Sequence, residues 1–198
     1  MKIYLATNNP HKKEEISKIF SSHTILMPRD AGIDFDFEET GTTYLENALG
    51  KAITLFRSLG EPVVADDSGL SVPALGGAPG IYSSRYGSEK PGGKLEQSER
   101  NKYLLAKMQG IQDRRAFFVC CMVLVLEDYR IFTAQETVHG TIIHEPKGSG
   151  GFGYDPLFYI EDFGKTVAEL SEGEKNRISH RGRAGAVINA ILNNLNKE

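Results

Sequence analysis

The chain has 198 residues, of which 40% are hydrophobic and 25% charged, and its formal net charge is −3 at pH 7. This length is enough for one domain, or two tightly joined lobes, over residues 1–198 that folds without disulfide bonds, and the mild acidity provides no bulk attraction to nucleic acid or a membrane. No long apolar run or secretory signal occurs, so we expect a cytoplasmic protein whose partners are small molecules.

Apolar periodicity, caps and turn residues predict strands interleaved with helices. In chain order we expect a strand over 2–7, a helix over 10–20, a strand over 24–27, a helix from Thr43 to about Ser58, a strand over 62–66, a helix over 95–108, paired strands over 115–127 and 129–139, and an amphipathic C-terminal helix. The mixture predicts an α/β protein with three layers and a mixed sheet. The only cysteines, Cys120 and Cys121, are adjacent in a strand, so we expect free thiols on opposite faces.

Two adjacent carboxylates, Asp66 and Asp67, follow the apolar run over 62–65 and precede a glycine-rich loop over 68–80. Like charges this close raise one pKa unless a cation or hydrogen bonds compensate, so the pair indicates Mg²⁺, a proton or a catalytic role. The alternative is a turn with two solvated acids.

The segment from Thr7 to Lys12 places hydroxyl and amide groups, free backbone N–H groups and a lysine where a helix begins, with Asn9 as cap and Pro10 in the first turn. Helix N-termini bind anions, so this loop is a candidate phosphate site. The alternative is a plain helix cap beside a surface lysine, because the glycines of a P-loop are missing.

Gly148, Gly150 and Gly153 have the G-x-G-x-x-G spacing of dinucleotide-binding proteins. No helix is expected to follow them, because a proline and a β-prone aromatic run come next, so we reject a dinucleotide site. The favoured interpretation is a loop that presents Phe152 and Tyr154 to a planar base, and the alternative is that both aromatic side chains are core.

The segment over 172–183 is rich in charged side chains. Its first half is typical of a solvated face. By contrast, Ser179, His180 and Arg181 stand at a helix start and carry donors, which suits acceptor atoms on a phosphate or a base edge.

Taken together, these blocks resemble the inosine triphosphate pyrophosphatase family over nearly the whole chain. The matching blocks are Thr7-Asn8-Asn9-x-x-Lys12, Glu38-Glu39-Thr40-Gly41, Glu46-Asn47-Ala48 with Lys51, Ala65-Asp66-Asp67-Ser68-Gly69-Leu70, residues 75–86, Gly151-Phe152-Gly153-Tyr154-Asp155-Pro156, and Glu174-Lys175-x-x-Ile178-Ser179-His180-Arg181-Gly182. The chain departs from the family at Pro10-His11, where the family often has a glycine before the lysine.

The resemblance implies hydrolysis of non-canonical purine nucleoside triphosphates (dITP, ITP, XTP and dXTP) to the monophosphate and pyrophosphate. It implies a homodimer and a long twisted mixed β-sheet flanked by helices, in two lobes with a central substrate cleft. Asp67 would be the general base and a Mg²⁺ ligand with Glu39, assisted by Glu38 or Asp66. Substrate binding would fall to Thr7, Asn8, Asn9, Pro10, His11, Lys12, Lys51, Ser68, Phe152, Gly153, Tyr154, Asp155, Lys175, His180 and Arg181.

Two alternatives stay open. A related family of septum-linked nucleotide pyrophosphatases has a similar fold and would prefer modified pyrimidines. A nucleotide-binding regulator would use the same loops without turnover. A Mg²⁺-dependent assay of pyrophosphate release on purine and pyrimidine triphosphates distinguishes all three.

Overall fold

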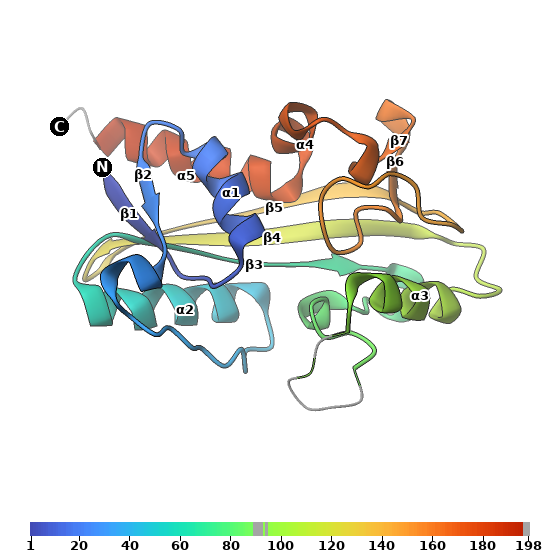
Figure 1. Ribbon diagram of the computed structural model, residues 1–198, viewed down its shortest axis with the longest axis horizontal. Helices are drawn as coiled ribbons and strands as arrows, with labels where there is room; N and C mark the ends of the chain where they lie inside the picture. The colour runs from blue at the N-terminus through green and yellow to red at the C-terminus, as the bar shows by residue number, and fades with distance from the viewer. Residues whose placement is uncertain (89–92, 94, 196–198) are drawn as a thin grey trace. The chain divides into compact units, whose positions relative to one another are not determined.

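The computed structural model describes residues 1–88, 93 and 95–195 of the chain. Its strands form one mixed sheet in the order β2-β1-β3-β4-β5-β6-β7, in which β1 pairs in parallel with β2 and β3, while β6 pairs antiparallel with β5 and β7 (Figure 1). The strands are β1 Lys2–Leu5, β2 Thr24–Leu26, β3 Val63–Ser71, β4 Arg115–Glu127, β5 Arg130–Ile142, β6 Phe158–Ile160 and β7 Lys165–Thr166. The α-helices are α1 Pro10–Ile19, α2 Tyr44–Leu59, α3 Gln97–Lys107, α4 Glu172–Ile178 and α5 His180–Leu195. The expected α/β class with a mixed sheet is confirmed.

The chain divides into two compact units, with the divisions falling inside β3, β4, β5 and α4. Unit 1 comprises Met1–Ser68, Cys120–Glu136 and Asn176–Glu198, and unit 2 comprises Gly69–Val119 and Thr137–Lys175. Among the described residues, no helix is long and apolar enough to cross a membrane.

The strands of unit 1 are covered on both faces, with α1 and α5 on one side and α2 on the other (Figure 1). One buried cluster joins Val64 and Cys120 to apolar residues of α1 and α5, and a second joins Ala65 and Cys121 to those of α2. Neighbouring residues of a strand thus pack into different clusters, because successive side chains point to opposite faces of the sheet. Both cysteines are buried free thiols on opposite faces, as expected.

The main correction to the expected elements concerns β3. The sequence predicts that this strand ends at Asp66, but the strand continues to Ser71, so both acids lie in its middle. The remainder of the expected loop contains a short 3₁₀ helix, Pro73–Leu75, and a second one begins at Gly80. The cause is tertiary, since β3 is a central strand between β1 and β4, and buried acids are tolerated there only with partners.

Helix caps agree with the expectations. The Asn9 side chain accepts a hydrogen bond from the backbone N–H of His11 (2.9 Å), and Thr43 and Glu46 form the capping box of α2. The C-terminal helix is present as α5, whereas α4 and β7 are not among the expected elements. α4 occupies the charge-rich segment that composition assigns to a solvated face, and six of its seven residues are partly or fully exposed to solvent around the buried Lys175.

Candidate active site

Asp66 and Asp67 project to opposite faces of β3, because side chains alternate along a strand. Asp66 lies on the side of α1 and α5, where its carboxylate meets Lys12 and Arg181. Asp67 lies on the side of α2, where its carboxylate meets Asn47 and Lys51. The two acids therefore do not form a shared pair, and each is compensated by its own donors.

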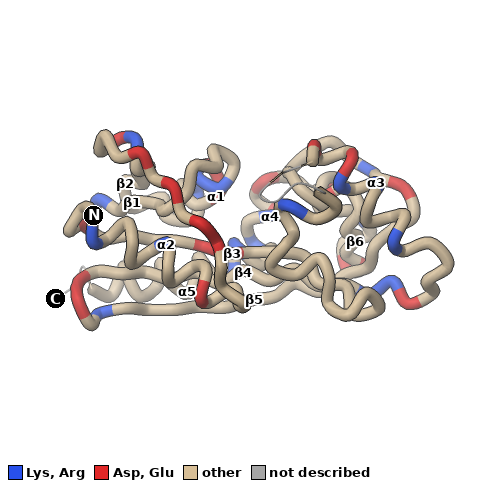
Figure 2. Tube along the Cα trace, turned by 90° about the horizontal axis from the view of Figure 1, so that it is seen from below, with Lys and Arg blue, Asp and Glu red and all other residues tan. Residues whose placement is uncertain are grey.

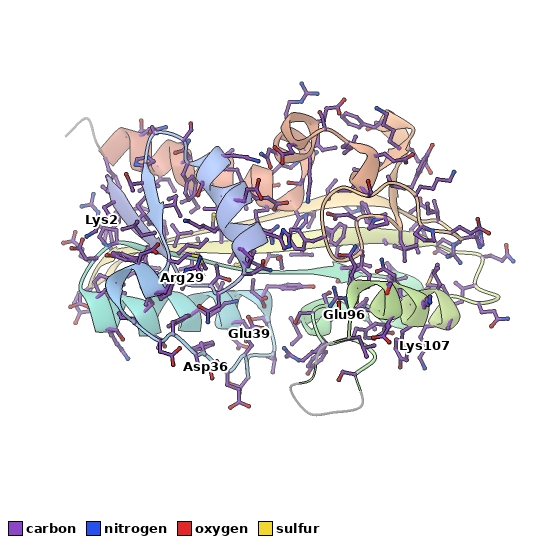
Figure 3. All side chains as sticks on the ribbon, viewed as in Figure 1. Lys2, Arg29, Asp36, Glu39, Glu96 and Lys107 are labelled. Atoms are coloured by element: carbon purple, nitrogen blue, oxygen red, sulfur yellow. The ribbon has the colours of Figure 1, made fainter. Side chains whose placement is uncertain are left out.

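Asp67 is 5% exposed, and its Oδ2 accepts a hydrogen bond from Asn47 Nδ2 at 3.0 Å. The ammonium of Lys51 lies 3.9 Å from Asp67 Oδ1 and is also bonded to the carboxylate of Glu39, on the loop before α2 (Figure 3). Burial raises the pKa of Asp67, and the nearby charge of Glu39 adds to that rise, while Lys51 and Asn47 act against it. Asp67 is thus a carboxylate held ready to accept a proton.

Lys51 and Asn47 reach Asp67 because they stand four residues apart on α2. Ala48, Ala52 and Leu55 are fully buried in the core beneath that helix. Burial lowers the pKa of Lys51, but the carboxylates of Asp67 and Glu39 outweigh it, so the net pKa is raised and the ammonium stays charged.

The Asp66 carboxylate contacts the side chains of several residues. Its Oδ2 lies 3.1 Å from Lys12 Nζ and accepts hydrogen bonds from Arg181 Nη2 (3.0 Å) and Nε (3.2 Å) and from Ser68 Oγ (3.3 Å). Burial favours the neutral acid, yet the cations of Lys12 and Arg181 hold the pKa of Asp66 well below its usual range. Asp66 therefore remains ionised.

Arg181 is 3% exposed and belongs to the first turn of α5. Besides Asp66, its guanidinium donates to Glu15 Oε2 on α1 (2.6 Å) and to Ser68 Oγ (2.8 Å). The preceding Ser179 accepts a hydrogen bond from the backbone N–H of Gly182 (3.0 Å), which confirms the predicted helix start, and His180 is buried beside it.

The predicted phosphate loop is ordered by its own side chains. Thr7 Oγ1 accepts from the backbone N–H of Asn9 (3.2 Å), and Asn8 Nδ2 donates to the carbonyl of Phe35 (2.7 Å). Pro10 and His11 are exposed in the first turn of α1. Lys12 is the residue of this loop whose side chain reaches the acids.

The three predicted metal ligands are not equivalent. Glu39 shares the ammonium of Lys51 with Asp67, whereas Glu38 is exposed on the same acidic loop (Figure 2). Within the described part of the chain, no three His, Cys, Asp or Glu side chains are grouped so that they could hold a metal ion by themselves. Mg²⁺ commonly uses only one or two carboxylates and completes its shell with water and substrate phosphates, so Asp67 and Glu39 fit such an ion.

Unit 2 contains the remaining predicted site residues in a separate group. Lys175 Nζ donates to Asp155 Oδ2 (2.9 Å) and lies 4.9 Å from the centre of the half-buried Phe152 ring. The same Asp155 oxygen accepts from the backbone N–H of Phe152 (2.9 Å). Gly153 donates its N–H to Gln97 (3.1 Å).

Tyr154 is buried in unit 2, and its hydroxyl donates to the carbonyl of Ser83 (2.9 Å). That burial raises the pKa of the phenol. Of the two aromatic residues predicted to face a base, Phe152 is half-buried and Tyr154 packs as a core residue.

Two residues in unit 1 received no role from the sequence, Asn47 and Glu15. Asn47 could have been found from its place four residues before Lys51 on one helical face. Glu15 carries no such signal, because its contact with Arg181 joins positions 166 residues apart.

Comparison with known proteins identifies relatives over almost the whole chain. A model of the Ham1 family matches residues 3–190. A Treponema denticola protein named dITP/XTP pyrophosphatase is 53% identical over 184 residues, which cover 93% of this chain and 94% of that protein.

Solved structures agree in fold. The Ham1 protein of Staphylococcus aureus has a TM-score of 0.87 at 39% identity, covering 98% of this chain and 99% of its own. A HAM1 protein from Coxiella burnetii has a TM-score of 0.88 at 36% identity, with the same coverage of both chains.

Proposed function

The chain belongs to the Ham1 family, and we propose that it hydrolyses non-canonical purine nucleoside triphosphates such as dITP and XTP to the monophosphate and pyrophosphate. Membership confirms the family resemblance carried by the sequence motifs. The name of the Treponema denticola relative supports the substrate class.

The observation that carries the mechanism is the different state of the two neighbouring acids. Asp66 is held ionised by two cations, whereas burial and Glu39 raise the pKa of Asp67. Acid–base roles in enzymes are commonly set by environments that push paired pKa values apart. We therefore assign Asp67 as the general base that orients and deprotonates the attacking water.

The charge balance of the ion-paired side chains around Asp66 and Asp67 supports a divalent cation. When ionised, the carboxylates Asp66, Asp67, Glu39 and Glu15 outnumber the cations Lys12, Lys51 and Arg181, so this group has one net negative charge. A nucleoside triphosphate brings about four more negative charges, and the repulsion between them needs a counter-ion.

Asp67 and Glu39, assisted by Glu38, would hold Mg²⁺. When bound, Mg²⁺ would neutralise charge and polarise the phosphoryl group. The Lys51 ammonium, which contacts the carboxylates of Glu39 and Asp67, would then also contact the phosphates.

Phosphate binding falls to the loop from Thr7 to Lys12. Its backbone leads into the N-terminus of α1, where the helix dipole favours anions, and Lys12 adds a charge. Ser68, His180 and Arg181 are also proposed substrate contacts in unit 1.

In unit 2, the group over Phe152 to Asp155 with Lys175 is the proposed base-binding element. Phe152 is half-buried, and stacking of a base on an aromatic ring contributes about 1–3 kcal/mol. Because Lys175 already contacts Asp155 and the ring, it serves to orient this element.

The deciding experiment is a pyrophosphate-release assay with dITP, XTP, dATP, dUTP and dTTP in MgCl₂. Release from dITP and XTP, with little from the others, is expected. Release mainly from pyrimidine substrates would favour the septum-linked class, and binding of dITP without pyrophosphate release would favour a regulator.

We also propose that the enzyme acts as a homodimer in the cytoplasm, the compartment of the nucleotide pool. Sedimentation equilibrium of the purified chain tests the dimer, since a mass of about twice 21.8 kDa is expected.

A further inference from the structure

We propose that Asp66 is a positioning residue for this reaction, whose buried carboxylate holds the side chains of Lys12 and Arg181 in place for the substrate and does not bind the metal. The proposal rests on the pyrophosphatase function above. It gives a separate role to an acid that, from its sequence position alone, is indistinguishable from its neighbour Asp67.

The surroundings of Asp66 leave no place for a metal ion. Oδ2 is already approached within 3.3 Å by four donor atoms, from Lys12, Ser68 and Arg181. Oδ1 is buried and has no hydrogen-bond partner among the described residues. A Mg²⁺ ion that keeps several waters cannot reach an oxygen in such a position.

The contacts of Lys12 show what the acid does instead. Lysine has a flexible stem that must be restrained if its ammonium is to meet a phosphate at a defined point. Lys12 Nζ is held twice by one residue, at 3.1 Å from Asp66 Oδ2 and at 3.3 Å from the Asp66 carbonyl oxygen. Asp66 therefore restrains the ammonium through both its side chain and its backbone.

The same oxygen anchors Arg181. Its Nε and Nη2 both donate to Asp66 Oδ2, while its Nη1 donates to Glu15 on α1. The Asp66 carboxylate on β3 thus links Lys12 of α1 to Arg181 of α5. Because the Asp67 group lies on the other face of β3, Asp66 acts through these two cations and not through the Lys51 and Glu39 group.

A double-mutant cycle between Asp66→Asn and Lys12→Ala tests the proposal. Affinity for dITP is measured by calorimetry in EDTA, where no turnover occurs, and KM and kcat are measured in MgCl₂. We expect each single variant to weaken dITP binding and raise KM about tenfold, and the double variant to be about as weak as the worse single one. Losses that multiply to about a hundredfold would overturn the proposal.

The metal requirement provides a second readout. The Mg²⁺ concentration for half-maximal activity should stay within about twofold of wild type in Asp66→Asn, because no ligand is lost. A large increase would overturn the proposal. Asp113→Asn is the matched control, since it also breaks an Asp–Arg pair, but an exposed one with Arg115 in unit 2, and it should change nothing.

Asp66→Asn could fail to fold, because it leaves the buried Arg181 and the partly buried Lys12 without their shared anion. In that case the test is NMR of the wild-type protein with ¹⁵N-labelled lysine. The Lys12 signal is identified by its absence from the spectrum of Lys12→Ala. The Lys12 ammonium should exchange its protons more slowly than exposed lysines, and equal exchange would overturn the proposal. If the wild type binds dITP without hydrolysis, the proposed function fails, while the binding cycle still tests Asp66.

Discussion

At the scale of single residues, a pair of acids that looks symmetrical in the sequence has two different environments. Asp66 and Asp67 are adjacent and both buried, yet their pKa values move in opposite directions. The physical cause is the pleat of β3, which delivers Asp66 to two cations and Asp67 to one cation and a second carboxylate.

Asp67→Asn should lower kcat for dITP by about 10²–10⁴, the usual contribution of a general base. In the wild type, activity should fall as the pH falls through the raised pKa of Asp67, because the protonated acid cannot accept a proton. The variant should lack that acidic limb. Rate profiles from pH 4 to 9 check both points, with the exposed Asp36→Asn as control.

The same substitution should stabilise the fold at neutral pH. A carboxylate whose folded pKa lies above its unfolded value of about 3.9 binds its proton more tightly when folded, so stability falls as the pH rises through that window. Asp67→Asn removes this cost, and its amide still accepts from Asn47. Thermal unfolding should show a higher midpoint than wild type at pH 7 and a smaller difference near pH 4; a lower midpoint at pH 7 would contradict the assignment.

At the scale of elements, the turn between α4 and α5 depends on one glycine. A Cβ at Gly182 would overlap the carbonyl oxygen of Asn176 and approach Ser179 Oγ to 3.2 Å. Arg181, whose guanidinium bonds Asp66, directly precedes Gly182 in the first turn of α5. Close packing at this point therefore holds the start of α5 that carries the proposed contacts.

Gly182→Ala should destabilise the protein by about 1–3 kcal/mol, as overpacking does, and raise KM for dITP by displacing Arg181. Urea unfolding and steady-state kinetics measure the two effects. Gly173→Ala is the matched control in α4, because its added Cβ meets nothing within 4 Å and alanine favours a helix. Equal behaviour of the two variants would show that the turn tolerates a side chain.

At the scale of the whole molecule, Asp67 and Glu39, which are proposed to hold the metal, have partners without it. Lys51 already bonds Glu39 and lies near Asp67, and the buried clusters of unit 1 are apolar. The fold should therefore not depend on the ion that the reaction needs.

Removal of divalent ions with EDTA should abolish pyrophosphate release and leave the thermal midpoint within about 2 °C of the untreated protein, since a structural metal would contribute far more. Addition of MgCl₂ should restore activity. Activity that persists in EDTA would exclude Mg²⁺ from the mechanism, and a large drop in the midpoint would indicate a structural metal site.

The sequence by itself determined the α/β class, the caps of α1 and α2, the C-terminal helix and, through its motifs, the family. These features depend on local signals, because Asn9, Thr43 and the apolar spacing of α5 act within a few residues. The tertiary structure decided that β3 runs on to Ser71, that Asp66 and Asp67 face different helices, and that Tyr154 is core. It also decided that Glu15 meets Arg181, because a contact across 166 positions leaves no trace in local spacing.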